Sequence, residues 1–259
     1  MKIIRRIAIS FSIYSRIPMP RVEWKEDDMS SSLDFFPLVG LVIGVLEFLF
    51  NSPQASMFLN PLARVFISVL IPIAVTGGFH VDGFMDTSDA LGSYGDKEKK
   101  LEILKDPHIG AFSVIALVKL LLAALASASV ILTSEKITLQ TVLVCSLVFV
   151  ISRCASGLTS IFFEKAKIIG MLQSEAGRRR KSTVMLLVIQ LILSSVTMLI
   201  LDLRTAVAVI CVLILFTIFY KMKTGKEFGG VTGDTAGFYL CMSEVLSVAV
   251  IALMLILKR

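Results

Sequence analysis

Three aspartates between Thr76 and Gly110 have the spacing expected of a metal site. Asp82, Asp86 and Asp89 occur at i, i+4 and i+7, which places them on one narrow stripe of a helix. Carboxylates this close repel one another unless a cation lies among them, and such hard oxygen ligands suit Mg²⁺ or Mn²⁺ better than zinc. A helix that leaves a membrane can also carry acidic residues because its end is solvated. The shared stripe favours a site for Mg²⁺ or Mn²⁺, and Gly77, Gly78 and Gly83 would leave room for a bulky ligand to approach the backbone.

A second candidate segment is GGVTGDTAG, at residues 229–237. A glycine-rich turn that opens a helix can present backbone N–H groups to phosphate, so Gly230 and Gly233 are candidate substrate-binding positions. Asp234 could supply a further metal oxygen. The alternative is a flexible loop followed by an acidic helix start. Glu244 lies about three turns further on, within an apolar run where an ionisable group is costly and usually functional.

The composition indicates what must position these residues. The chain of 259 residues is 56% hydrophobic with a mean hydropathy of +0.84, which excludes a soluble domain and predicts an all-α polytopic membrane protein. We expect one integral membrane domain over residues 1–259, with an Asp-rich active-site segment at 76–110 and a Gly-rich loop at 225–237. About seven segments are apolar enough to cross, although several are shorter than the roughly 20 residues of a straight span: 35–50, 62–77, 111–132, 138–152, 184–201, 205–220 and 238–257.

The N-terminal segment predicts an amphipathic helix on the membrane surface. Ile3, Ile7, Phe11 and Tyr14 fall on one helical face, and no small-residue cleavage site follows, so the segment does not resemble a signal peptide. The turn at residues 15–20, SRIPMP, ends this helix. The four cysteines form no C-x-x-C pair and are expected to be small buried apolar residues.

The loop charges predict an orientation. In the predicted topology, twenty of the 26 Lys and Arg residues lie on the same side of the membrane as the N-terminus. Five lie on the opposite side, and Lys119 lies within a span. The positive-inside rule therefore places the N-terminus in the cytoplasm and the C-terminus outside the cell membrane. The segment 76–110, the loop 153–182 and the loop 225–237 would then share the cytoplasmic side and could form one site.

Three ionisable residues within or near the spans have more than one interpretation. Lys119 could reach back to the membrane surface or pair with a carboxylate such as Glu244. Glu47 is expected near the outer end of the first span, where it could reach water. As an ion path, these three residues would indicate a transporter. The acids instead gather at one face and no internal repeat is evident, so transport is the weaker hypothesis.

Hard-metal carboxylates, Gly-rich turns and basic residues on one membrane side indicate phosphoryl-group transfer. The CDP-alcohol phosphatidyltransferases, which act on lipids, use such chemistry and carry DG-x-x-AR. In this chain Asp82-Gly83 is followed by Phe-Met-Asp, without Ala-Arg. That family remains an alternative on chemistry but does not fit the motif.

The sequence closely resembles the adenosylcobinamide-GDP ribazoletransferase (cobalamin synthase) family. The resemblance rests on GGFHVDGFMDTSDALGS, on LEILKDPHIGAFSVIALVK and on GGVTGDTAG with a later Glu. The SRIPMP turn, the DFFPLVGLVIG start of the first span and Arg153 look like further family positions. The resemblance therefore covers nearly the whole chain.

The resemblance implies that adenosylcobinamide-GDP reacts with α-ribazole, or its 5′-phosphate, and that GMP is released. It also implies a requirement for Mg²⁺, a bilayer location and no nucleic acid partner, and it leaves a homo-oligomer open. On this basis Asp82, Asp86 and Asp89 would organise the metal and the diphosphate. The further candidates are Asp106 and Asp234 as metal ligand or general base, and His80, Lys105, Arg153, Gly230, Gly233 and Glu244 in substrate binding.

Overall fold

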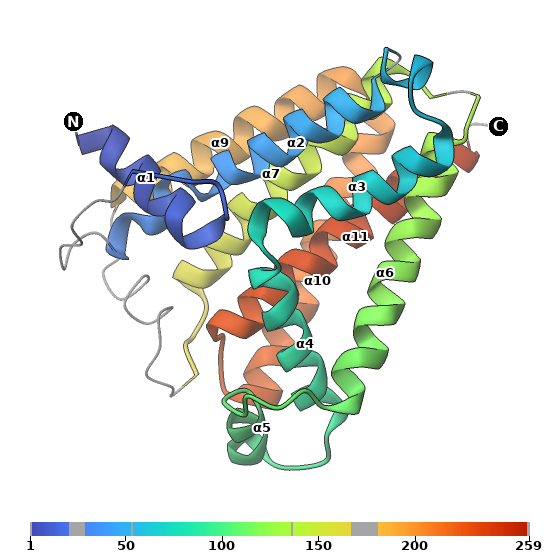
Figure 1. Ribbon diagram of the computed structural model, residues 1–259. Helices are drawn as coiled ribbons and strands as arrows, with labels where there is room; N and C mark the ends of the chain where they lie inside the picture. Colours follow the sequence, from blue (N-terminus) through green and yellow to red (C-terminus); the bar gives the residue numbers. More distant parts are fainter. Residues whose placement is uncertain (1, 21–28, 53, 136, 167–180, 258–259) are drawn as a thin grey trace.

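The computed structural model of the chain describes residues 2–20, 29–52, 54–135, 137–166 and 181–257 (Figure 1). These residues form helices, joined by short connections and one isolated parallel bridge between Lys165 and Val231. The elements are α1 (Lys2–Tyr14), η1 (Met29–Phe35), α2 (Phe36–Asn51), η2 (Ala55–Met57), α3 (Pro61–Thr76), α4 (Phe79–Gly92), α5 (Lys97–Ile103), α6 (Ala111–Leu132), α7 (Leu139–Phe162), α9 (Lys181–Leu201), α10 (Leu203–Phe228) and α11 (Gly233–Leu257).

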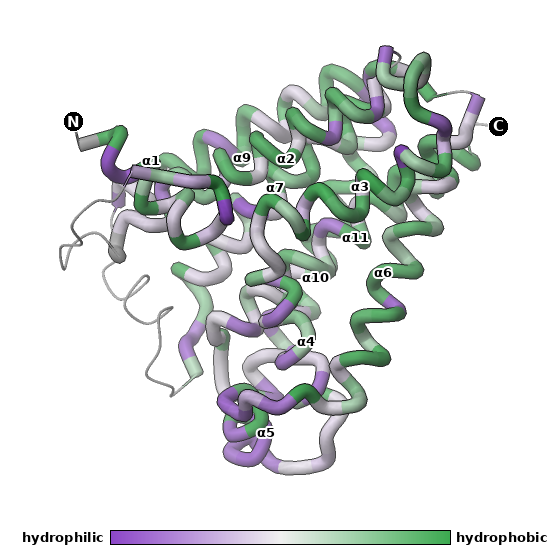
Figure 2. Tube along the Cα trace, viewed as in Figure 1, coloured by the Kyte–Doolittle hydropathy of each residue, from purple (hydrophilic) through white to green (hydrophobic). Residues whose placement is uncertain are grey.

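The helix lengths and composition confirm the all-α, polytopic membrane class. Six helices in the described ranges are long and apolar enough to cross a bilayer, the first of them formed by the end of η1 together with α2. The pair α3 and α4 also passes this test but is bent by 95° at residues 77–78. Counted with this bent pair, the structure has the seven crossings that the sequence predicts. Figure 2 shows the polar residues concentrated at α5 and its connections, beyond the mostly apolar helices.

Two predicted helix boundaries were wrong. The fourth span was expected to end at residue 152, but α7 continues to Phe162, so Arg153 lies inside a helix and not in a loop. The Gly-rich loop was expected over 225–237, but α10 extends to Phe228 and α11 begins at Gly233. Hydropathy detects only the apolar part of each helix, whereas polar helix-forming residues extend the helix beyond it.

Two glycines produce the sharp bend between α3 and α4. Gly77 (φ 67°) ends α3 and Gly78 (φ 81°) precedes α4, both in the left-handed region that residues with a Cβ rarely adopt. The N–H of Arg16 donates to the carbonyl of Val75 at 2.8 Å, so the SRIPMP turn packs beside the bend. We treat α3 as the crossing helix and α4 as lying outside the spanning helices.

The N-terminal helix is present as predicted, but its contacts differ from the expectation. Phe11 and Tyr14 are buried against Phe36 and its neighbours, whereas Ile3 is 64% exposed. Arg6 also forms an ion pair with the fully buried Asp34 at 3.1 Å. The C-terminal half of α1 is therefore packed onto the protein, and only its first turns present apolar side chains outward.

Candidate active site

The site is assembled where α4 packs against α11. A Cβ added to Gly83 would lie 2.9 Å from the backbone of Asp234, and one added to Gly237 would lie 2.8 Å from the carbonyl oxygen of His80. The two helix backbones are therefore in direct contact. The sequence suggested that Gly83 leaves room for a ligand, but in the structure it lets α11 approach. This contact brings Asp234 beside Asp82 and Asp86.

Four carboxylates interact electrostatically at this contact. Asp82 is exposed, while Asp86 and Asp234 are half-buried. Burial, together with the negative charges of Asp82, Asp234 and Asp89, raises the pKa of Asp86 to about 6. We call Asp82, Asp86, Asp89 and Asp234 the acidic cluster. Sequence spacing predicted the first three as a group, and the fold adds Asp234 from a helix about 150 residues further along the chain.

The donor set of the acidic cluster fits Mg²⁺ by its chemistry. All four side chains are hard oxygen donors, and their mutual repulsion falls when a cation is present. Within the described ranges, no three Asp, Glu, His or Cys side chains already converge as a ready-made metal site. Proteins commonly hold Mg²⁺ through one or two carboxylates together with waters and substrate phosphates. The arrangement therefore suits a metal shared with a phosphorylated substrate better than a closed protein cage.

Asp89 also has a structural contact. Its carboxylate accepts a hydrogen bond from the backbone N–H of Ser113 at 3.3 Å, at the start of α6. Gly110 leaves space for this carboxylate, because a Cβ at that position would lie 2.1 Å from its oxygens. Negative charge at a helix N-terminus is stabilising. Asp89 thus joins α4 to α6 at the edge of the acidic cluster.

The structure does not bring Lys105 and Asp106 into the cluster. Both are exposed in the connection between α5 and α6. Asp106 accepts hydrogen bonds from the backbone N–H of His108 at 3.0 Å and from its ring at 2.6 Å, and these two bonds lower the pKa of Asp106. The carboxylates that raise the pKa of Asp86 do not include Asp106.

Arg153 and Glu244 form a buried ion pair between α7 and α11. The Nη1 of Arg153 donates to Glu244 Oε1 at 2.6 Å and to the carbonyl of Phe149 at 2.9 Å. Of the two roles that the sequence left open for Lys119, pairing with Glu244 was therefore wrong, and Lys119 is exposed on α6. The side chain of Arg153 is 1% exposed, so its charge lies within the bundle and not in a cytoplasmic loop.

His80 is buried in the first turn of α4, within a group of aromatic rings. Its ring centroid lies 6.3 Å from that of Tyr14, 5.6 Å from that of Phe36 and 5.3 Å from that of Phe79. The Nδ1 atom of His80 makes no hydrogen bond with the described residues. Sequence reasoning placed His80 beside the aspartates but did not predict its contacts with Tyr14 and Phe36, because these residues come from α1 and the start of α2.

The Gly-rich segment packs against the chain that follows α7. Val231 donates to the carbonyl of Glu164 at 2.8 Å, and Ala166 donates to the carbonyl of Val231 at 3.1 Å. Gly230 is needed for this contact, since a Cβ there would lie 2.5 Å from the backbone at Ala166. Gly233 is different, because it is exposed and has open space around its Cα. Of the two glycines, only Gly233 presents a surface that a phosphate could approach.

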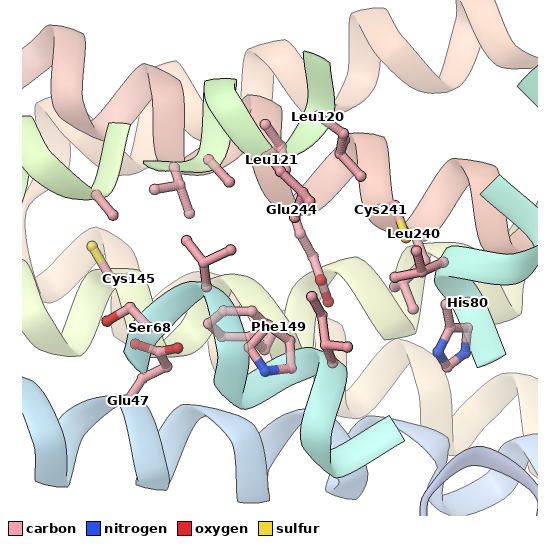
Figure 3. A pocket seen from close by; sticks show the side chains of 18 of the residues that line it. Glu47, Ser68, His80, Leu120, Leu121, Cys145, Phe149, Leu240, Cys241 and Glu244 are labelled. Carbon is pink, nitrogen blue, oxygen red and sulfur yellow. The ribbon is translucent and has the colours of Figure 1, made fainter. Parts of the chain in front are cut away.

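A cavity of about 140 Å³ lies inside the bundle between α2, α3, α6, α7 and α11 (Figure 3). Glu47 and Ser68 lie at one end, His80 lies at the other and Glu244 lies between them. Glu47 is 6% exposed and accepts a hydrogen bond from the side-chain amide of Asn51 at 2.9 Å, so the expectation that it reaches water was wrong. Sequence reasoning missed the cavity, because it has no motif and its lining comes from distant helices.

Comparison with known proteins identifies the family. A model of the family described as cobalamin-5-phosphate synthase matches residues 6–252. The chain belongs to this family. It is 38% identical to the adenosylcobinamide-GDP ribazoletransferase of Lachnoclostridium phytofermentans over 95% of this chain and 93% of that protein. A protein of the same name from Clostridium perfringens (strain SM101) is 31% identical over 93% of this chain and 94% of that protein. Another, from Clostridioides difficile, is 30% identical over 97% of this chain and 98% of that protein. No solved structure matches the chain.

The comparisons support the resemblance seen in the sequence and favour neither alternative. Neither the lipid phosphotransferase nor the transporter hypothesis is represented among these relatives, which match nearly end to end. The segment that forms the acidic cluster and the segment of the Arg153–Glu244 pair both lie within residues 6–252. The site described above is therefore part of the shared family region.

Proposed function

We propose that the chain is a membrane-bound transferase that joins adenosylcobinamide-GDP to α-ribazole or α-ribazole 5′-phosphate and releases GMP. The names of its relatives supply the substrates. The main observation that supports placing the reaction at this site is the acidic cluster. It is formed by α4 and α11 at the polar end of an otherwise apolar bundle.

The reaction breaks a phosphoanhydride bond and forms a phosphate ester bond. The ribose 3′-hydroxyl oxygen of α-ribazole attacks the phosphorus next to cobinamide, the bond from that phosphorus to the GMP oxygen breaks, and GMP leaves. The hydroxyl proton passes to a base. Mg²⁺, when bound, supplies positive charge that neutralises the diphosphate and the departing phosphate. Without such neutralisation the acidic cluster would repel a diphosphate.

The chain's own residues would perform the remaining tasks. Asp82 and Asp86, held on one stripe of α4, would hold the metal, and Asp89 would complete the same face while joining α4 to α6. Asp234 faces this stripe from α11 and is our candidate for the proton acceptor, because it is the one cluster carboxylate on another helix. Gly233 begins α11, where free backbone N–H groups favour a phosphate oxygen.

The membrane setting is part of the proposal. The α4 segment, the start of α11 and the chain after α7 lie at one end of the bundle, as the contacts of Gly83 and Val231 require. We propose that this end faces the cytoplasm across the cell membrane, with the C-terminus outside. The support is the excess of Lys and Arg on that side of the predicted topology.

A product assay tests the proposal. Purified protein in detergent, with Mg²⁺, is given adenosylcobinamide-GDP with α-ribazole, with its 5′-phosphate or with neither. We expect GMP and a cobalamin product in equal amounts, and only when a ribazole substrate is present. Release of GDP in place of GMP would place the attack on another bond. No ribazole-dependent nucleotide release would reject the proposed function.

A further inference from the structure

The cavity inside the bundle has features of a ligand site that the acidic cluster does not explain. Four buried polar atoms of its lining residues make no hydrogen bond with the described residues: the Nε of Arg153, the Nδ1 of His80, the Oε1 of Glu47 and the Oδ1 of Asn51. Arg153 is 1% exposed and His80 is 7% exposed. A buried polar atom without a partner is unfavourable, so the nitrogens of Arg153 and His80 indicate a missing polar partner. The two residues are also close enough to interact electrostatically.

The rest of the lining is apolar around the middle of the cavity. Leu121, Ala124 and Val245 contribute to the walls of the cavity, together with Phe149. An apolar cavity of about 150 Å³ is large enough to take a benzene molecule. The volume of about 140 Å³ thus excludes a corrin ring or a whole nucleotide and suits one small flat ring system. The cavity combines polar groups at both ends with apolar walls, and the unpartnered nitrogens belong to Arg153 and His80.

We propose that this cavity binds the aromatic base of α-ribazole, a flat, mostly apolar heteroaromatic ring with one hydrogen-bond acceptor nitrogen. The inference rests on the proposed function and adds a binding site to it. Arg153 Nε or His80 Nδ1 donates to the ring nitrogen, and the apolar walls contact the ring carbons and methyl groups. A lipid acyl chain would fill the apolar part of the cavity but would leave both nitrogens without a partner.

The position of the cavity end at His80 is compatible with the reaction. His80 precedes Asp82 by two residues on α4, and its backbone lies against Gly237, one turn after Asp234 on α11. A base held at this end keeps its ribose on the side of the acidic cluster. The ion pair with Glu244 fixes the guanidinium of Arg153, so its free N–H has a defined direction.

A substitution on α6 tests the site with a matched control on the same helix. Ala124 lines the cavity, whereas the neighbouring Ala123 is exposed on the outer face of α6. Ala124→Phe should fill the cavity and raise the KM for α-ribazole at least about 10-fold, while the KM for adenosylcobinamide-GDP stays unchanged. Ala123→Phe should leave both values as in the wild type. Ala124→Val is the milder variant if Ala124→Phe does not fold.

Comparing two substrates that differ in their base distinguishes a change in the binding site from a general loss of folded protein. α-Ribazole is compared with the corresponding riboside that lacks the two ring methyl groups. Because one methylene in an apolar pocket changes discrimination about 10–200-fold, both Ala124 variants should shift the ratio of kcat/KM toward the smaller base, by about 10-fold for Ala124→Phe. An equal loss on both substrates, or an unchanged KM and base preference, would overturn the inference. Wild-type protein without any transfer activity would instead reject the proposed function.

Discussion

The Arg153–Glu244 pair gives a sharp prediction about stability. The two side chains are 1% and 13% exposed and are joined at 2.6 Å across α7 and α11. Glu244→Leu leaves the guanidinium of Arg153 buried without a counter-charge. Removing one partner of a buried pair costs about 3–5 kcal/mol, whereas replacing both by apolar side chains of similar size is often neutral. Glu244→Leu should therefore lower the free energy of unfolding by that amount, and Arg153→Met combined with Glu244→Leu should recover most of it.

The assay is reversible unfolding of the purified protein by SDS in mixed micelles, followed by far-UV circular dichroism. Lys119 provides the control, because it is a basic residue of a spanning helix but is exposed on α6. Lys119→Met should change the stability by less than about 0.5 kcal/mol and should not rescue Glu244→Leu. Rescue by Lys119→Met in place of Arg153→Met, or a cost of Glu244→Leu below about 1 kcal/mol, would refute the reasoning.

Three further predictions concern packing and topology. Gly83→Ala should lower the unfolding free energy by about 1–3 kcal/mol, because its Cβ would meet the backbone of Asp234. Gly225→Ala on α10 is the control: a Cβ there meets open space, so the variant should show no loss in the same unfolding assay. Asp89→Ala should cost about 0.5–2 kcal/mol through the lost contact with α6, and Asp89→Asn, which keeps an acceptor for Ser113, should not; equal losses would contradict that role. With native cysteines replaced, a cysteine at the fully exposed Tyr94 should react with a membrane-impermeant thiol reagent only after cells are opened. A cysteine at the exposed Met57 should react from outside intact cells. The opposite pattern would reverse the proposed orientation.

The features that follow from local periodicity could be predicted from the sequence. The aspartate stripe lies on one helix, α4, because the i, i+4, i+7 spacing is a property of a few turns. The crossing segments follow from hydropathy alone, and the count of seven holds once the bent pair is included. Three of the four cysteines are buried or half-buried and all four are free, as expected, although Cys211 is exposed on α10.

The features that depend on contacts between distant helices could not be predicted. The partner of Glu244 could be chosen only by knowing which face of α11 meets α7, and hydropathy does not give that face. The same holds for the cavity and for the burial of Glu47. The role of Gly83 was misjudged for a related reason. A glycine in a helix fits both a ligand contact and a close helix contact, and only the position of Asp234 distinguishes them.

The acidic cluster is proposed to carry out metal-dependent phosphoryl transfer. The most direct test measures GMP release from adenosylcobinamide-GDP and α-ribazole by the wild type, Asp82→Asn and Asp86→Asn, each after EDTA treatment and after Mg²⁺ is returned. We predict that EDTA abolishes release by the wild type and that Mg²⁺ restores it. Each variant should insert normally but lose at least about 10²-fold in turnover, since charge neutralisation and positioning are lost together. Near-normal turnover of both variants, or full activity in EDTA, would contradict the claim.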